Sequence, residues 1–184
     1  MRRDAIHVLR ISLLFVALSV CNMPSRAQSV SEDTAKAAFL FRFTDYVDWP
    51  PRAWRGEDFT FAVFQDDGVA TALESILATH RIKGHPARVK RIHTAAEAAG
   101  AQIVFLGAGD PDAQRRFIAT LANPPALIVT DSDQGLNEGS TVNFRLIDRH
   151  LRFEVSLTAA RQCGIQISSD LLSVAMRVEG QDVK

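Results

Sequence analysis

Three short runs of mostly apolar residues constrain the fold of this chain more than any other feature of its sequence. They span Phe59–Phe64, Gln102–Leu106 and Ala126–Thr130, and turn-forming or polar residues bound each of them. Runs of this length without regular polar alternation are typical of strands that are buried on both faces, as in a parallel sheet. The sequence therefore predicts a sheet whose central strands are covered on both sides.

Segments with a helical spacing of apolar residues lie between these runs. Helices are expected at 31–48, 69–80 and 111–121, with a further strand at 87–92 and a short helix at 94–100. Strands that alternate with helices indicate an α/β fold. We expect three layers, in which a mostly parallel sheet is flanked by helices on both faces.

The last third of the chain has a different pattern, which predicts a C-terminal β-hairpin followed by short helices. The expected elements are strands at 141–147 and 151–157, a turn at 148–150, and helices at 158–163 and from Ser168 through Arg177. Gly164 should end the first of these helices, because glycine readily adopts the left-handed conformation of a helix C-terminus. Ser168 should cap the second, because its hydroxyl can accept a hydrogen bond from the first turn.

The N-terminus carries the pattern of an export signal. Basic residues precede an apolar run at Ile11–Cys21, and Ser25-Arg26-Ala27 places small residues at the two positions that a signal peptidase reads. We therefore expect a signal peptide over residues 1–27, cleaved after Ala27, and an exported mature chain. Lipidation of Cys21 and an uncleaved membrane anchor are the alternatives, although the apolar run is short for a membrane span.

Composition narrows the class of protein further. The chain has 184 residues, of which 47% are hydrophobic, and its 21 basic residues balance its 21 acidic ones. The apolar fraction excludes a disordered chain, and zero net charge removes a general electrostatic reason to bind nucleic acid. No linker, repeat or low-complexity segment interrupts the sequence, so residues 28–184 are expected to form a single domain.

The sequence contains no convincing constellation for catalysis or metal binding. The histidines at 80, 85, 93 and 150 have no paired spacing on one helix face, so ordinary structural or surface roles are favoured. Neither Ser168 nor Ser169 lies in a nucleophile elbow, and Cys163 is interpreted as a small buried residue. We expect no catalytic residue, no metal and no cofactor. A hydrolase with an unrecognised site is an alternative.

Two loops follow predicted strands and lie where open α/β sheets place their ligands. Gly107–Asp110 lacks the third glycine of a dinucleotide fingerprint, so a plain turn capped by Asp110 is favoured. Thr130–Asp133 offers carboxylates and hydroxyls but lacks the further ligands of a calcium loop. A second hypothesis is a small-molecule sensor whose ligand contacts Gly107, Gly109, Asp110, Thr130, Asp131 and Asp133.

Aromatic residues are concentrated in and just after the first predicted helix. They are Phe39, Phe41, Phe43, Tyr46, Trp49 and Trp54. One helix face cannot bury all of them, so the remaining aromatics form either a second contact with the core, which is favoured for any single residue, or an exposed docking surface. Together with the charges of the hairpin, they predict a partner-binding surface made of Phe41, Trp54, Phe144, Arg145, Phe153 and Glu154.

A series of short segments is similar, in order and spacing, to one known family. The segments are Lys36–Leu40, Phe43, Trp49-Pro50, Phe61–Val63, Ile82–Pro86, Ile103–Leu106, Leu127–Asp131, Arg152–Ser156, Ala159–Arg161 and Gly164–Leu172. Together they extend over nearly the whole expected mature chain. Through these segments the sequence resembles the YfiR-like family of periplasmic proteins.

The resemblance implies a regulator rather than an enzyme. YfiR-like proteins are periplasmic α/β proteins that associate as homodimers, and the best-known member represses an inner-membrane diguanylate cyclase by binding its periplasmic region. An outer-membrane lipoprotein can sequester that repressor, after which cyclic di-GMP and biofilm formation rise. Many members carry a cysteine just before the third core strand. This chain has Ala101-Gln102 there, so redox control is not expected.

Overall fold

The predicted apolar runs form the centre of an eight-stranded sheet. The computed structural model describes residues 26–54, 56–121 and 124–180. In it β2 (Phe59–Phe64), β5 (Ile103–Leu106) and β6 (Leu127–Thr130) are buried along their whole length. β5 pairs in parallel with β2 on one side and with β6 on the other. The expectation of doubly covered central strands is confirmed.

The strands of this sheet follow the order β10-β8-β7-β6-β5-β2-β4-β3. The outer strands are β3 (Arg81–Ile82), β4 (His85–Ile92), β7 (Val142–Ile147), β8 (His150–Ser156) and β10 (Arg177–Glu179). The β3–β4 and β7–β8 pairs are antiparallel hairpins, and the other neighbours are parallel. The chain moves from β2 to β4 on one side and then to β5 on the other, so the strand order reverses between β2 and β5.

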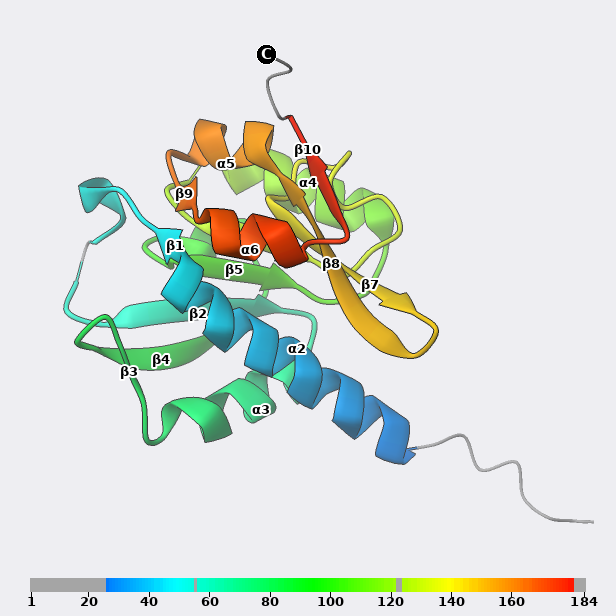
Figure 1. Ribbon diagram of the computed structural model, residues 1–184. Coiled ribbons are helices and arrows are strands. Elements are labelled where there is room, and N and C mark those ends of the chain that lie inside the picture. Colours follow the sequence, from blue (N-terminus) through cyan, green and yellow to red (C-terminus); the bar gives the residue numbers. More distant parts are fainter. Residues whose placement is uncertain (1–25, 55, 122–123, 181–184) are drawn as a thin grey trace, which may run out of the picture.

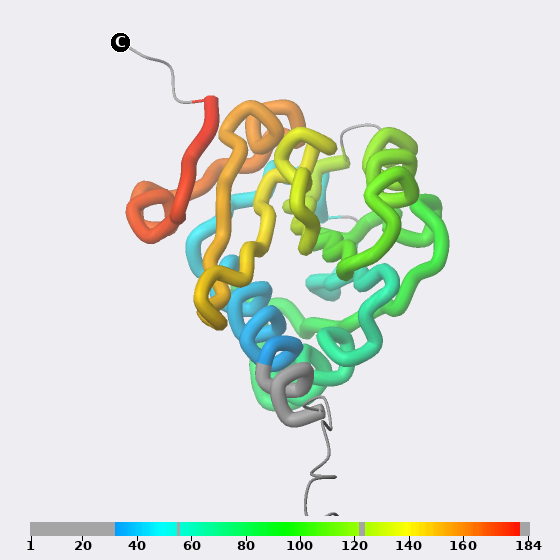
Figure 2. Tube along the Cα trace, turned by 90° about the vertical axis from the view of Figure 1, so that its right-hand side faces the viewer, coloured from blue at the N-terminus to red at the C-terminus, as the bar shows by residue number. Residues whose placement is uncertain are grey.

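Helices cover both faces of the sheet, so the three-layer α/β architecture is confirmed. α2 (Arg26–Tyr46), α3 (Asp67–Leu77) and α6 (Ser169–Val174) lie in front of the sheet in Figure 1, and α4 (Pro111–Leu121) lies behind it. Figure 2, turned by 90°, shows α4 and α6 on opposite sides. The shorter elements are α5 (Leu157–Cys163), η1 (Pro51–Ala53), η2 (Ala95–Ala98), and β1 (Val47–Asp48) paired with β9 (Gln166–Ile167).

α2 is held on the sheet by one strongly apolar face. Ala37 and Leu40 are fully buried and Phe43 is 1% exposed, whereas Ala38 and Asp45 face solvent. Buried residues spaced by three and four positions are the pattern of a helix that packs on a sheet with one stripe. The predicted helix is therefore present, although it ends at Tyr46, two residues earlier than expected.

The C-terminal segment differs from the prediction. Ser168 caps α6 as expected, since its hydroxyl accepts a hydrogen bond from the Leu171 backbone N–H. However, α6 ends at Val174 instead of continuing through Arg177, because the chain turns extended and Arg177–Glu179 pairs with β8. The preceding helix does end at Gly164, which adopts the left-handed conformation with φ 72°.

The expected signal segment lies outside the described residues, apart from Arg26 and Ala27 in the first turn of α2. Cleavage after Ala27 therefore stays a prediction. Within the part of the chain that the structure describes, no helix has the length and apolar character needed to cross a membrane.

Candidate functional site

Two of the residues predicted to bind a partner are buried in the structure. Phe144 is 1% exposed and Phe153 is 3% exposed. Both lie on the hairpin face that α2 covers, where the Phe43 ring is 6.0 Å from Phe144 and 5.3 Å from Phe153, between centroids. Side chains alternate between the two faces of a strand, so the α2-facing positions of β7 and β8 are buried. Phe144 and Phe153 are therefore buried and not exposed, although Phe153 lines the groove described below, and their contact with a partner stays a prediction.

The predicted contact residues Phe41 and Trp54 are half-buried and lie in different places. The Phe41 ring packs edge-on against His80, with centroids 5.0 Å apart. The Trp54 ring lies against His85, with centroids 4.5 Å apart, and also contacts Phe59. Each ring is therefore anchored locally, and the structure does not bring the two together.

An apolar groove lies between α2, α6 and β8 on the front face of the sheet. Its volume is about 650 Å³, and the apolar side chains that line it are Phe39, Phe43, Phe153, Leu171 and Val174. Arg42 and Asp170 also line the groove, on α2 and α6 respectively. Figure 1 shows α6 and α2 in front of the sheet, with β8 running past the end of α6. A short α6 leaves this part of the sheet less covered than the centre.

Exposed apolar residues gather at two places, one of which is beside this groove. Val174 is 66% exposed and Met176 is 46% exposed, directly after α6. Leu146 is 47% exposed and Ile147 is 41% exposed, at the tip of the β7–β8 hairpin, which extends beyond the helices in Figure 1. These are the large hydrophobic side chains most open to solvent in the described chain. Sequence analysis missed Val174 and Met176, because a helix through Arg177 gives no reason to single them out.

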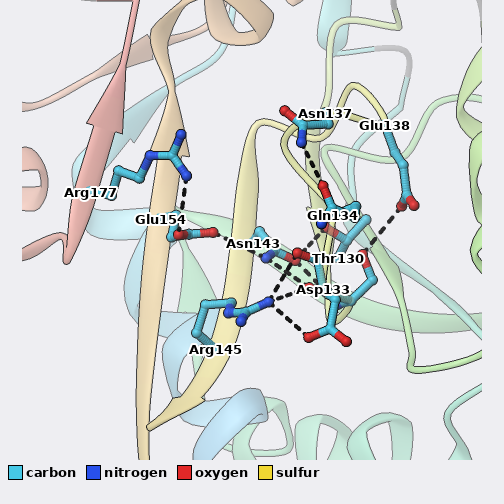
Figure 3. A network of polar contacts seen from close by, with 10 residues as sticks. Thr130, Asp133, Gln134, Asn137, Glu138, Asn143, Arg145, Glu154 and Arg177 are labelled. Carbon is cyan, nitrogen blue, oxygen red and sulfur yellow. Dashed lines mark hydrogen bonds and ion pairs between the residues drawn. The ribbon is translucent and has the colours of Figure 1, made fainter.

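The opposite face of the hairpin carries a polar network (Figure 3). Thr130 donates to Asn143 Oδ1 at 2.9 Å, and Asn143 Nδ2 donates to the Ser132 carbonyl at 3.0 Å. Arg145 donates to the Asp133 carboxylate at 3.0 Å. The network fixes the loop after β6 against β7, and it holds the predicted residues Arg145, Thr130 and Asp133 together.

Glu154, another predicted contact residue, belongs to the same network. Its carboxylate accepts a hydrogen bond from Asn143 at 3.3 Å and lies 3.8 Å from an Arg177 nitrogen, so β8 is linked to β7 and β10 (Figure 3). Only 12% of the Glu154 side chain is exposed. Its contacts within the chain indicate a structural role on this face.

The strand-end loops form a hollow of about 360 Å³ at the carboxyl edge of the sheet. Of the six residues predicted for a ligand, Gly109, Asp131 and Asp133 line it. Gly107 is required by close packing, because a Cβ there would lie 2.6 Å from the Asp66 Cβ. Asp110 accepts a hydrogen bond from the Asp112 backbone N–H at 3.1 Å, which agrees with its predicted role as a cap.

Beside this hollow, a buried lysine joins α2 to the end of β6. The Lys36 ammonium pairs with Glu32 at 2.8 Å and with Asp131. Burial by itself would lower the pKa of Lys36, but the hydrogen bonds and charges of Asp131 and Glu32 outweigh it and hold the pKa above its ordinary value. The ammonium therefore compensates the carboxylates at this edge.

Residues 33–176 match the sequence model of the YfiR/HmsC-like family. The chain belongs to this family. The match extends over most of the chain and includes α2, the central strands, the hairpin and α6.

Comparison with solved structures supports the fold of this YfiR-like chain. A crystal structure of a conserved domain protein from Vibrio cholerae O1 biovar El Tor has a TM-score of 0.52 and 12% sequence identity. The alignment covers 80% of this chain and 60% of the Vibrio chain, so this chain spans about three-fifths of that protein. No curated protein matches the sequence.

No metal centre is assembled among the described residues of this YfiR-like chain. No group of three or more His, Cys, Asp or Glu side chains there is placed to hold a metal ion. Cys163 is buried, and burial raises the pKa of its thiol. The burial of Cys163 agrees with its interpretation as a small buried residue.

Proposed function

We propose that this YfiR-like chain is a periplasmic repressor that binds the periplasmic region of an inner-membrane diguanylate cyclase and lowers cyclic di-GMP and biofilm formation. Family membership supports the signalling context. The observation that carries the binding role is the apolar groove, with Val174 and Met176 exposed beside it. Exposed apolar surface of this kind is typical of protein interaction sites.

The groove has the chemistry of a protein-binding site. Aromatic and aliphatic side chains line it, and Arg42 and Asp170 supply charges of opposite sign at its sides. In protein interfaces a few buried aromatic and aliphatic anchors provide most of the binding energy, and surrounding charges fix orientation. We expect the cyclase to insert apolar side chains here, with the hairpin tip at Leu146 and Ile147 as a second contact.

Repression requires only that the groove binds one state of the cyclase more tightly than the other. Moving a switch from 99% active to 99% inactive takes about 5.5 kcal/mol of differential binding. An interface of standard size, about 1,600 Å² in total, supplies more than this when it contains several anchors. The exposed surface around the groove can therefore account for repression without any chemical step.

We propose that the mature chain begins after Ala27, acts as a homodimer, and is released from the cyclase by an outer-membrane lipoprotein. Mass spectrometry of the periplasmic protein tests the first point, and sedimentation tests the second. A competition titration tests the third point: the lipoprotein should displace the cyclase region that is bound to the repressor. A negative result in any one of these experiments would remove that point from the proposal. The groove would still be the proposed cyclase-binding site.

A binding titration with the purified periplasmic region of the cyclase tests the proposal. Replacing the exposed Val174 by Glu places a charge beside the groove and should weaken binding about tenfold or more, since a desolvated unpaired charge costs several kcal/mol. Ala96→Glu, on the exposed surface of η2, is the matched control and should bind normally. Equal affinities of the two variants would contradict the placement of the interface.

A further inference from the structure

The outer edge of β4 is open over most of its length. β4 has eight residues, and β3 pairs only with the first two of them, His85 and Pro86. On its inner side, residues 87–92 pair with β2 along the whole of that strand. Nothing in the described chain continues the sheet beyond β4 and the short β3. Residues 87–92 therefore present a row of backbone N–H and C=O groups without a strand partner.

The β3–β4 hairpin concentrates positive charge at this edge. Residues 80–93 contain five basic residues and no Asp or Glu, although the chain as a whole has zero net charge. In Figure 1 the hairpin lies at the end of the sheet opposite β7 and β8. The basic residues are Arg81, Lys83, Arg88, Lys90 and Arg91. A concentrated charge of one sign attracts a partner of the opposite sign.

Arg88 and Lys90 are the basic side chains of β4 most available to a partner. They are two positions apart, so they lie on one face of the strand, and both line a small hollow of about 240 Å³. Arg88 is 63% exposed and lies 3.6 Å from the Asp58 carboxylate, a surface pair of little strength. Lys90 donates to the Glu97 carbonyl at 2.7 Å and forms no ion pair within the described residues. Arg91, on the other face, is bound by carboxylates of α3.

We propose that the open edge of β4 binds an extended acidic segment of another protein, which pairs with residues 87–92 as an additional strand and places carboxylates opposite Arg88 and Lys90. In strand addition, main-chain hydrogen bonds provide affinity and alternate side chains provide specificity. Opposite charges on neighbouring strands stabilise their pairing, and like charges destabilise it.

Charge and backbone together select this occupant over two others. A second copy of the chain would bring its own basic β4 against this one, so like charges oppose a β4–β4 dimer. An anionic membrane surface matches the charge but offers no strand to the open backbone groups. The edge is separated from the apolar groove by the central strands, so the inference does not depend on the proposed repressor function.

Synthetic peptides and the purified full chain test the proposal. A blocked peptide of about eight residues, in which glutamate alternates with valine, supplies both a strand and acidic side chains. It should give saturable heat in calorimetry at submillimolar concentration, bind more weakly as sodium chloride is added, and slow amide hydrogen exchange within residues 87–92. A peptide with proline in place of valine keeps the charge but cannot pair as a strand. This peptide, a lysine–valine peptide and phosphatidylglycerol vesicles should not slow that exchange.

Charge reversal identifies the side chains that select the peptide. Arg88→Glu combined with Lys90→Glu should weaken binding of the glutamate–valine peptide about tenfold or more, and should create binding of the lysine–valine peptide. Arg116→Glu combined with Arg152→Glu is the matched control, because it makes the same charge change at exposed arginines of α4 and β8. The control should bind the glutamate–valine peptide as the wild type does.

The wild-type exchange experiment keeps the test decisive if the reversed variant does not fold. Equal protection of residues 87–92 by the proline peptide or by the vesicles would show that charge alone acts, and would overturn the proposal. Absence of wild-type binding at millimolar peptide would also overturn it, as would protection of residues 87–92 by self-association without any peptide. In a folded reversed variant, unchanged affinity for the glutamate–valine peptide would do the same.

Discussion

Lys36 of α2 forms an ion pair with Asp131 at the end of β6, although only 6% of the lysine side chain is exposed. The pair connects the helix that covers the sheet to the edge where β5 and β6 end. Glu32, one turn earlier on α2, binds the same ammonium at 2.8 Å. Paired and hydrogen-bonded burial is the condition under which a lysine can be retained inside a protein.

Lys36→Met should destabilise the fold by about 3 kcal/mol, because it leaves Asp131 without its cation. Arg42→Met is the control: Arg42 pairs with Asp45 on the surface, with side chains 65% and 53% exposed, and its loss should change stability by less than about 0.5 kcal/mol. Urea unfolding measures both. Equal effects of the two substitutions would show that the Lys36 pair has no special role.

The raised pKa of Asp66 predicts that the stability of the protein depends on pH. Burial raises the pKa of the Asp66 carboxyl, and the neighbouring Asp33 and Asp131 add to this, although the Val69 N–H and Lys36 oppose it. The fold disfavours the ionised carboxyl. The contribution of protonated Asp66 to stability is therefore present at low pH and is lost as the pH rises through the pKa that Asp66 has in the folded state.

Asp66→Asn keeps an acceptor for the Val69 N–H and removes the charge. Its free energy of unfolding should exceed that of the wild type at pH 7, and the difference should vanish below pH ~3. Asp67→Asn, whose side chain is 91% exposed in its pair with Arg91, is the matched surface control. Parallel stability–pH curves for the wild type and Asp66→Asn would contradict the assignment.

Phe144 and Phe153 should behave as core residues. Phe144→Ala leaves a cavity beside Phe43 and should destabilise the protein by about 3–5 kcal/mol. Phe41→Ala removes a half-buried ring that touches His80, so its effect on stability should be clearly smaller. Chemical denaturation compares the two. A small effect of Phe144→Ala would return this residue to the candidate contact surface.

Cys163 should react slowly with thiol reagents in the folded protein. Burial raises the pKa of the thiol, which lowers the fraction of reactive thiolate, and the surrounding structure restricts access. At pH 8 the rate with a disulfide reagent should rise by orders of magnitude after denaturation in guanidinium chloride. Similar rates in both states would show that Cys163 is an accessible thiol.

The elements with strong local signals could be predicted from sequence. The Phe59–Phe64 strand and the Pro111–Leu121 helix have the predicted bounds, because an apolar run and an N-terminal proline define them locally. The end of α6 could not be predicted, since the pairing of Arg177–Glu179 with β8 is a tertiary interaction. Helical propensity alone does not show that the chain leaves the helix at Val174.

In the candidate sites, too, some features could be predicted from local sequence signals and others arise only from tertiary interactions. Sequence position placed Gly109, Asp131 and Asp133 at strand ends, and the topology brings them to one hollow. The burial of Phe144 was not predictable from alternation, because alternation separates two faces of a strand without showing which one α2 covers.

The central claim, that this YfiR-like protein acts by binding a cyclase through its apolar groove, is tested most directly by cyclase activity. Cyclic di-GMP synthesis by the membrane-inserted cyclase should fall as wild-type protein is added to its periplasmic side. Val174→Glu should need at least about tenfold more protein for the same inhibition, whereas Ala96→Glu should match the wild type. Full synthesis at saturating wild-type protein, or equal inhibition by Val174→Glu, would contradict the account.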